Sequence, residues 1–211
     1  MAFDLEEQEQ LDALKAWWKA HGAKVVVGVL VFAVAVAGYR GWSWYLERQR
    51  AEAAQLYSAL EQAFVGGDTK KVRALAGEIM ERYRRTPYAV DAALLVAKAN
   101  VQGGDRKSAK QQLQWVMDQA RDEQSRDLAR LNLAGLLLDD REYEAALKLL
   151  EAPHNPAFDV LYQERRGDVL AAQGKNDAAR AAYRAALERL AKEAPARAVL
   201  EIKLDALESR G

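Results

Sequence analysis

Turn-forming residues recur at a nearly constant spacing after residue 48, in a stretch whose other residues favour helix. Ala, Leu, Glu, Lys and Arg dominate there, apolar residues recur every three or four positions, and the alternating runs typical of strands are absent. The intervals are 37, 37 and 33 residues when four positions are taken as equivalent: Gly67, Gly104, Arg141 and Gly174. A repeat of this length with one turn midway predicts a solenoid of helical hairpins.

The fourth repeat carries the residue pattern that makes the class of solenoid specific. Small residues stand at Gly167, Ala179 and Ala186, and a large aromatic residue stands at Tyr183. Small side chains let the two helices of a hairpin approach closely, and the aromatic ring fills the gap to the next hairpin. The pattern resembles the tetratricopeptide repeat, which implies an all-α fold. A helix over 196–208, apolar at Val199, Ile202, Leu204 and Leu207, is expected to cap the last repeat.

An apolar run near the N-terminus lies outside the repeats. Between Lys24 and Arg40 there are 15 uncharged residues, and extension to Leu46 gives 22 residues with one charge, or about 33 Å of helix. That length is sufficient to cross a bilayer. Aromatic residues that favour the membrane–water boundary flank the run on both sides: Trp17, Trp18, Trp42, Trp44 and Tyr45.

These flanks favour a signal anchor, although two alternatives stay open. Ala35-Val36-Ala37 matches a signal-peptide cleavage site, and a short apolar run also suits the core helix of a soluble protein. The favoured interpretation divides the chain into an N-terminal tail with an amphipathic helix (1–23), a transmembrane signal anchor (24–46) and the repeat domain (47–211). Gly22 is expected to end the first helix.

The span offers one candidate contact face, but its charges do not orient it. Each side carries three Lys or Arg residues within about 15–20 positions, so the positive-inside rule gives a tie. Small residues four apart line one face of the span, which predicts a helix–helix interface. They are Ala33, Ala37 and Gly41.

Charge and residue types exclude several functional classes. The 31 Lys and Arg residues balance 31 Asp and Glu residues, and no basic stripe suited to nucleic acid is present. The absence of cysteine removes disulfides, thiolate zinc sites and thiol catalysis. His21 and His154 are expected to be solvated polar side chains. Because neither a phosphate-binding loop nor a nucleophile–base set is present, we expect no enzyme, cofactor or metal site.

The first helices of successive hairpins are expected to line a concave groove. Its apolar floor suits a peptide or a partner helix, unless a loop or the terminal helix of this chain covers it. Some repeats of this class hold a C-terminal carboxylate with paired Lys and Asn. That clamp is absent here, because the matching groove positions are Leu94 and Lys98, Leu131 and Gly135, and Glu164 and Asp168. The partner-binding candidates on this register are Leu94, Lys98, Leu128, Leu131, Leu138 and Leu161.

Taken together, the chain resembles the YfgM-like family, the ancillary subunit of the bacterial SecYEG translocon. The resemblance is most specific where Glu-Glu-Gln at 6–8 precedes Leu-Lys-Ala-Trp-Trp-Lys at 14–19, Gly22 and Gly-Tyr-Arg-Gly-Trp at 38–42. It implies a single-pass protein of the bacterial inner membrane, with a cytoplasmic N-terminus and periplasmic repeats. The implied partners are the SecYEG translocon, a membrane-anchored parvulin-like periplasmic chaperone and newly exported client proteins, in addition to membrane lipid.

Three functions are compatible with these features. The resemblance implies a membrane-tethered adaptor that links the translocon to periplasmic chaperones. An envelope scaffold or assembly factor would need the same tether. A regulator that sequesters another protein in the cytoplasm would need the opposite orientation.

Overall fold

The computed structural model describes residues 2–208, and the side chains of residues 9–207. It divides into two compact units, Met1–Ala51 and Glu52–Gly211. Every regular element in the described part is helical, as the sequence predicted. The elements are α1 (Ala2–Val65), α2 (Thr69–Arg82), α3 (Pro87–Gln102), α4 (Arg106–Gln119), α5 (Glu123–Asp139), α6 (Tyr143–Leu150), the short 3-10 helix η1 (Pro156–Phe158), α7 (Asp159–Ala172), α8 (Asn176–Glu188) and α9 (Ala196–Glu208).

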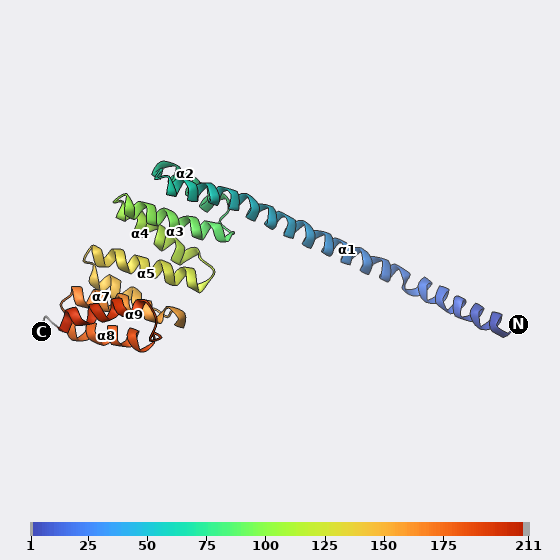
Figure 1. Cartoon of the computed structure of the whole chain (residues 1–211). Coiled ribbons are helices and arrows are strands. Elements are labelled where there is room, and N and C mark those ends of the chain that lie inside the picture. The colour runs from blue at the N-terminus through green and yellow to red at the C-terminus, as the bar shows by residue number, and fades with distance from the viewer. Residues whose placement is uncertain (1, 209–211) are drawn as a thin grey trace. The chain divides into compact units, whose positions relative to one another are not determined.

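The second unit is a stack of helical hairpins, which Figure 1 shows in order from α2 to α9. The last turns of α1 pair with α2, and the later pairs are α3 with α4, α5 with α6, and α7 with α8. Alternating large and small buried side chains fill the space between them. Ala97, Ala109, Ala134 and Ala146 are each no more than 2% exposed, so the helices approach closely at these positions.

Each hairpin turn uses the same backbone device at the position that the spacing predicted. Within the described residues, positive φ occurs only at Gly67, Gly104, Arg141 and Gly174, with φ values of 71°, 78°, 61° and 75°. The next N–H in each case donates to the carbonyl five residues earlier, as in Glu142 to Leu137 at 2.8 Å. The turn prediction is therefore confirmed, including the non-glycine residue Arg141.

Helix α9 packs on the last hairpin, but the predicted apolar positions do not all face it. Leu200 and Leu207 are buried against α8, whereas Val199 and Ile202 are 50% and 68% exposed. The buried face of α9 therefore runs through Leu200, which packs in the cluster of Ala182 and Tyr183, whereas Val199 lies outside that cluster.

In the first unit, α1 continues through Gly22, so the prediction that this residue ends a helix is wrong. Gly22 has no positive φ, and it lies under the ring of Trp18, whose Cδ2 would lie 3.1 Å from an added Cβ. Glycine inside a helix costs about 0.5–1 kcal/mol relative to alanine, and at this position the missing Cβ leaves room for the Trp18 ring. Residues 6–8 of the family resemblance lie outside the described side chains.

In the part of the chain that the structure describes, α1 is the one helix long and apolar enough to cross a membrane. Only 6% of its most apolar window is buried. A core helix of a soluble protein would be mostly buried, so the core-helix alternative does not fit. Ala33, Ala37 and Gly41 are all exposed on this helix, and their role as an interface stays a prediction.

Candidate partner-binding groove

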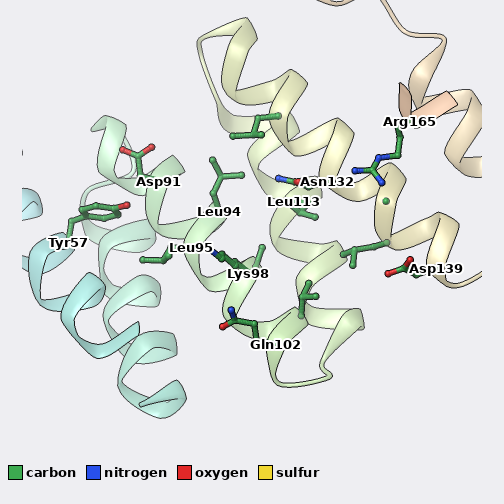
Figure 2. Close-up of a pocket in the computed structure, with 15 residues that line it drawn as sticks. Tyr57, Asp91, Leu94, Leu95, Lys98, Gln102, Leu113, Asn132, Asp139 and Arg165 are labelled. Atoms are coloured by element: carbon green, nitrogen blue, oxygen red, sulfur yellow. The ribbon is translucent and has the colours of Figure 1, made fainter. Parts of the chain in front are cut away.

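A cavity of about 710 Å³ opens on the repeat unit. Its walls come from the end of α1, from α3, α4 and α5, and from a single side chain of α7, Arg165. Figure 2 shows Tyr57 and Asp91 on one side of the cavity and Asp139 and Arg165 on the other, with Leu94 between them. A hollow of about 190 Å³ lies next to it and shares Leu128, Asn132 and Arg165. We call the two together the groove.

The structure brings together five of the six predicted partner-binding residues. Leu94, Lys98 and Leu128 line the larger cavity, and Leu131 and Leu161 line the smaller hollow. Leu131 is only 6% exposed and also belongs to the core. Leu138 lines neither and packs against the core cluster instead.

Exposed apolar side chains form the floor of the groove. Val101 and Leu128 are 40% and 41% exposed, and Leu161 in the neighbouring hollow is 47% exposed. Covering exposed apolar side chains with another apolar surface removes them from water, which lowers the free energy. The floor can therefore accept apolar side chains of a partner.

The side of the groove at Asp91 is acidic. Burial raises the pKa of the Asp91 carboxyl, and the nearby Asp122 and Glu61 raise it further. The pKa of Tyr57 is raised as well, first by burial and then by Asp91 and Glu61. Among the described side chains, none makes a hydrogen bond or ion pair with the Asp91 carboxylate, so its charge faces the groove without compensation.

The opposite side is positively charged and offers hydrogen-bond donors. The guanidinium of Arg165 lies over Gly135 of α5, where an added Cβ would lie 3.4 Å from its Cζ and Nη1. Its Nε is buried and has no hydrogen-bond partner in the described structure. Its Nη1 forms an ion pair with Asp168, 3.7 Å from Oδ2, but this contact is too long for a hydrogen bond. Asn132 lines both cavities beside it.

Other charges at the groove are already paired or held on a ring. Asp139 forms an ion pair with Arg106, whose Nη2 is 3.6 Å from Oδ2. The ammonium of Lys98 lies 5.4 Å from the centre of the Phe64 ring, a cation–π distance, and this lysine is exposed to the cavity. Of the acids that face the groove, Asp91 is therefore the one whose charge is least offset.

Helix α9 covers part of the predicted groove, on the α7 side. Nζ of Lys203 donates to Glu164 and to Asp168, both at 2.7 Å, and Tyr183 OH donates to Asp168 at 2.9 Å. The alternative that the terminal helix fills the groove therefore holds for the acidic residues of α7. It does not hold for the α3 and α5 walls, which line an open cavity.

The repeat register identified the apolar residues of the groove but missed Asn132 and Arg165. Each follows the predicted groove position of its helix by one residue, since the register pointed to Leu131 and Glu164. One signal was available in the sequence. The repeats on either side carry Lys98 and Asp168 at the position of Gly135, and a missing side chain makes room for a long one from the next hairpin.

No arrangement suited to catalysis or metal binding was found within the described residues. They contain no group of three or more His, Cys, Asp and Glu side chains placed to hold a metal ion. His154, expected to be solvated, has a structural role instead. It stacks on Tyr162 with ring centres 3.7 Å apart, and its Nε2 lies 2.8 Å from Asp159 Oδ1.

Comparison with known proteins agrees with this architecture. The profile of the tetratricopeptide repeat-like domain family matches residues 15–209. A protein of Neisseria gonorrhoeae is 32% identical over 98% of this chain and 100% of its own length, and it is named an ancillary SecYEG translocon subunit. Proteins with the same name from Haemophilus influenzae and Escherichia coli are 26% and 25% identical, over 87% and 86% of this chain and 89% and 87% of their own lengths. The chain therefore belongs to the tetratricopeptide repeat-like family of ancillary SecYEG translocon subunits.

Proposed function

We propose that this protein is a membrane-tethered adaptor of the export machinery, which binds the SecYEG translocon and passes newly exported chains to periplasmic chaperones. The N-terminus lies in the cytoplasm and the repeats lie in the periplasm. The observation that carries the proposal is the full-length match to a relative named as a translocon subunit, combined with one apolar helix ahead of the repeats. A membrane-anchored parvulin-like chaperone is the second partner.

The exposed aromatic residues of α1 support anchoring by this helix. Trp17 and Trp18 precede the apolar run, Trp42, Trp44 and Tyr45 follow it, and all five are exposed. Indole and phenol rings favour the headgroup region, so two such belts hold a helix across the bilayer. Arg40 lies between the run and the second belt, where its long side chain can reach the headgroups.

Tethering explains how a weak repeat surface would act. A domain confined near the channel meets an emerging chain at a high effective concentration, so a low intrinsic affinity is sufficient. Weak binding also allows release, which a handover between channel and chaperone requires. The groove supplies such a surface without any catalytic group.

Site-specific photo-crosslinking in intact cells tests the partners. A photoreactive residue replaces Ala37 in the span in one variant and Leu128 in the groove in another, and a third variant carries it at the exposed Arg121 as a control. We expect adducts with translocon subunits, a periplasmic chaperone or exported chains from the first two positions and not from the control. Adducts to cell-wall enzymes alone would contradict the export role.

Protease accessibility in spheroplasts tests the orientation. Protease added outside is expected to digest the repeats while a cytoplasmic marker protein stays intact. Repeats that survive until the spheroplasts are lysed would place them in the cytoplasm and overturn the adaptor proposal.

A further inference from the structure

The groove combines three features that together specify a ligand. An acid without a partner lies on one side, apolar side chains form the floor, and the other side carries a guanidinium whose Nη1 is in a long ion pair but not in a hydrogen bond. Each feature comes from a different helix: Asp91 from α3, Leu128 from α5 and Arg165 from α7. The charges of the two sides are opposite, so a ligand with one charge sign would be repelled at one of them.

The donors at the Arg165 side match a carboxylate. A guanidinium presents its N–H groups in a plane, and this geometry fits the two oxygens of a carboxylate. The bare backbone at Gly135 lets the guanidinium lie against α5 beside Asn132, whose amide adds further donors. Asp168, which forms a long ion pair with Arg165, already accepts hydrogen bonds from Lys203 and Tyr183.

We propose that the groove binds an extended segment of another protein that places an acidic side chain against Arg165 and Asn132, apolar side chains on Leu128, and a lysine or arginine beside Asp91. This inference rests on the proposed function, since it describes the segment that an exported chain would present. The groove would recognise the order of charged side chains along the segment, and not a free C-terminal carboxylate.

The burial of Asp91 supports the cationic end of this segment. A carboxylate whose charge is disfavoured by burial and by nearby acids gains more from a cation than a solvated one does. Lys98 lies two turns along α3 from Asp91, about 10 Å away at 1.5 Å per residue. Its positive charge disfavours a lysine or arginine of the segment at that end of α3, which leaves Asp91 as the place for the cation.

Fluorescence anisotropy with the full chain in detergent micelles tests the proposal. The probe is a labelled synthetic peptide with one lysine, a central run of leucine and phenylalanine, and one glutamate, with both ends blocked. Matched peptides replace the glutamate with glutamine, or exchange the glutamate for lysine. We expect the glutamine peptide to bind about tenfold more weakly, because one charge-assisted contact is lost.

Variants of the protein make the test specific to the groove. The Arg165→Glu variant is expected not to bind the peptide that carries glutamate. It should bind the peptide with lysine in place of that glutamate more tightly than the unchanged protein does. Asn132→Asp, at an exposed position, is expected to weaken glutamate binding because its own carboxylate would occupy the Arg165 donors. Arg121→Gln, exposed in the α4–α5 turn, is the matched control and should leave binding unchanged.

The outcomes separate this inference from the proposed function. Equal binding of glutamate and glutamine peptides, no binding of any peptide, or an Arg165→Glu variant with unchanged preference would overturn the groove assignment. Crosslinks from Leu128 only to a second copy of this chain would do the same. Retained crosslinks from Ala37 to the translocon in those cases would leave the proposed function standing, whereas their absence from the unchanged protein would refute the proposed function itself.

Discussion

The ring of Tyr183 lies directly on the backbone of Gly167. An added Cβ at Gly167 would lie 2.6 Å from Cδ1 and 2.9 Å from Cζ of that ring, closer than side chains approach in folded proteins. Tyr183 is only 3% exposed, and its hydroxyl donates to Asp168 at 2.9 Å, so the ring has little freedom to move. This contact joins α7 to α8 and sets how closely the last hairpin closes.

The substitution Gly167→Ala should therefore destabilise the repeat unit. We expect a loss of about 3 kcal/mol in the free energy of unfolding, since overfilling a packed contact forces side chains and backbone apart. Guanidinium unfolding of the full chain in detergent micelles, followed by circular dichroism, measures it. Gly77→Ala is the matched control: it lies inside α2 with open space around its Cα, so it should gain about 0.5–1 kcal/mol from helix propensity. Equal effects at the two sites would contradict this account.

The turn at Arg141 offers a stabilising substitution. Its φ of 61° is a conformation that side chains disfavour, and the three other hairpins use glycine there. We expect Arg141→Gly to raise the free energy of unfolding by up to about 1 kcal/mol, the gain in the folded turn being partly offset by a more flexible unfolded chain. The same unfolding experiment measures it. At Arg121, where φ is not positive, the change to glycine should be destabilising instead.

A buried carboxylate holds the loop that precedes α7. Asp127 is fully buried and accepts hydrogen bonds from Arg130 Nη1 at 2.7 Å, Asn155 N at 2.8 Å and Tyr162 OH at 3.1 Å. Asp127→Ala would leave the positive charge of Arg130 without its buried partner, so we expect a loss of about 3 kcal/mol in unfolding free energy.

Hydrogen exchange can localise this effect. The amide of Asn155 should lose its protection in Asp127→Ala, while amides of α3 keep theirs. For Asp118→Ala, which removes an exposed carboxylate bonded to Gln114, we expect a stability change within about 0.5 kcal/mol. Unchanged exchange at Asn155 would mean that the network does not fasten the loop.

The hairpin architecture was predictable because its signals are local. A residue that must take positive φ is usually glycine, so Gly67, Gly104 and Gly174 mark three turns, and the repeat length locates Arg141 as the fourth. Small residues such as Ala179 and Gly167 likewise report a close approach at their own positions.

The continuity of α1 and the polar residues of the groove depend instead on contacts that no single position reports. Glycine is common just after helix ends, but at Gly22 the helix continues and the ring of Trp18 lies against the residue. The side chain of α7 that lines the larger cavity depends on how far each hairpin is rotated against the one before. That rotation follows from the summed packing of many side chains, so the repeat register pointed to Glu164 where Arg165 reaches the cavity.

The charge of Asp91 gives the last prediction, which concerns pH. Burial, with Asp122 and Glu61, raises the pKa of this carboxyl in the folded protein above its unfolded value. The folded state then binds protons more readily than the unfolded state, so the Asp91 contribution to stability becomes less favourable as pH rises through the unfolded and then the folded pKa. We expect Asp91→Asn to be more stable than the unchanged protein near neutral pH, with the difference vanishing once the pH falls below the unfolded pKa.

Asp105 supplies a control of opposite sign. A hydrogen bond from the Ser108 backbone N–H lowers the pKa of Asp105, so its charge stabilises the fold above its unfolded pKa, and this stability is lost as pH falls through the folded pKa. Asp105→Asn should therefore be less stable than the unchanged protein at neutral pH and equal to it in acid. Unfolding curves of both variants over a pH series make the comparison. Parallel behaviour of the two variants would show that Asp91 carries no uncompensated charge, and the groove would then lack the acidic side that a cationic residue of a partner requires.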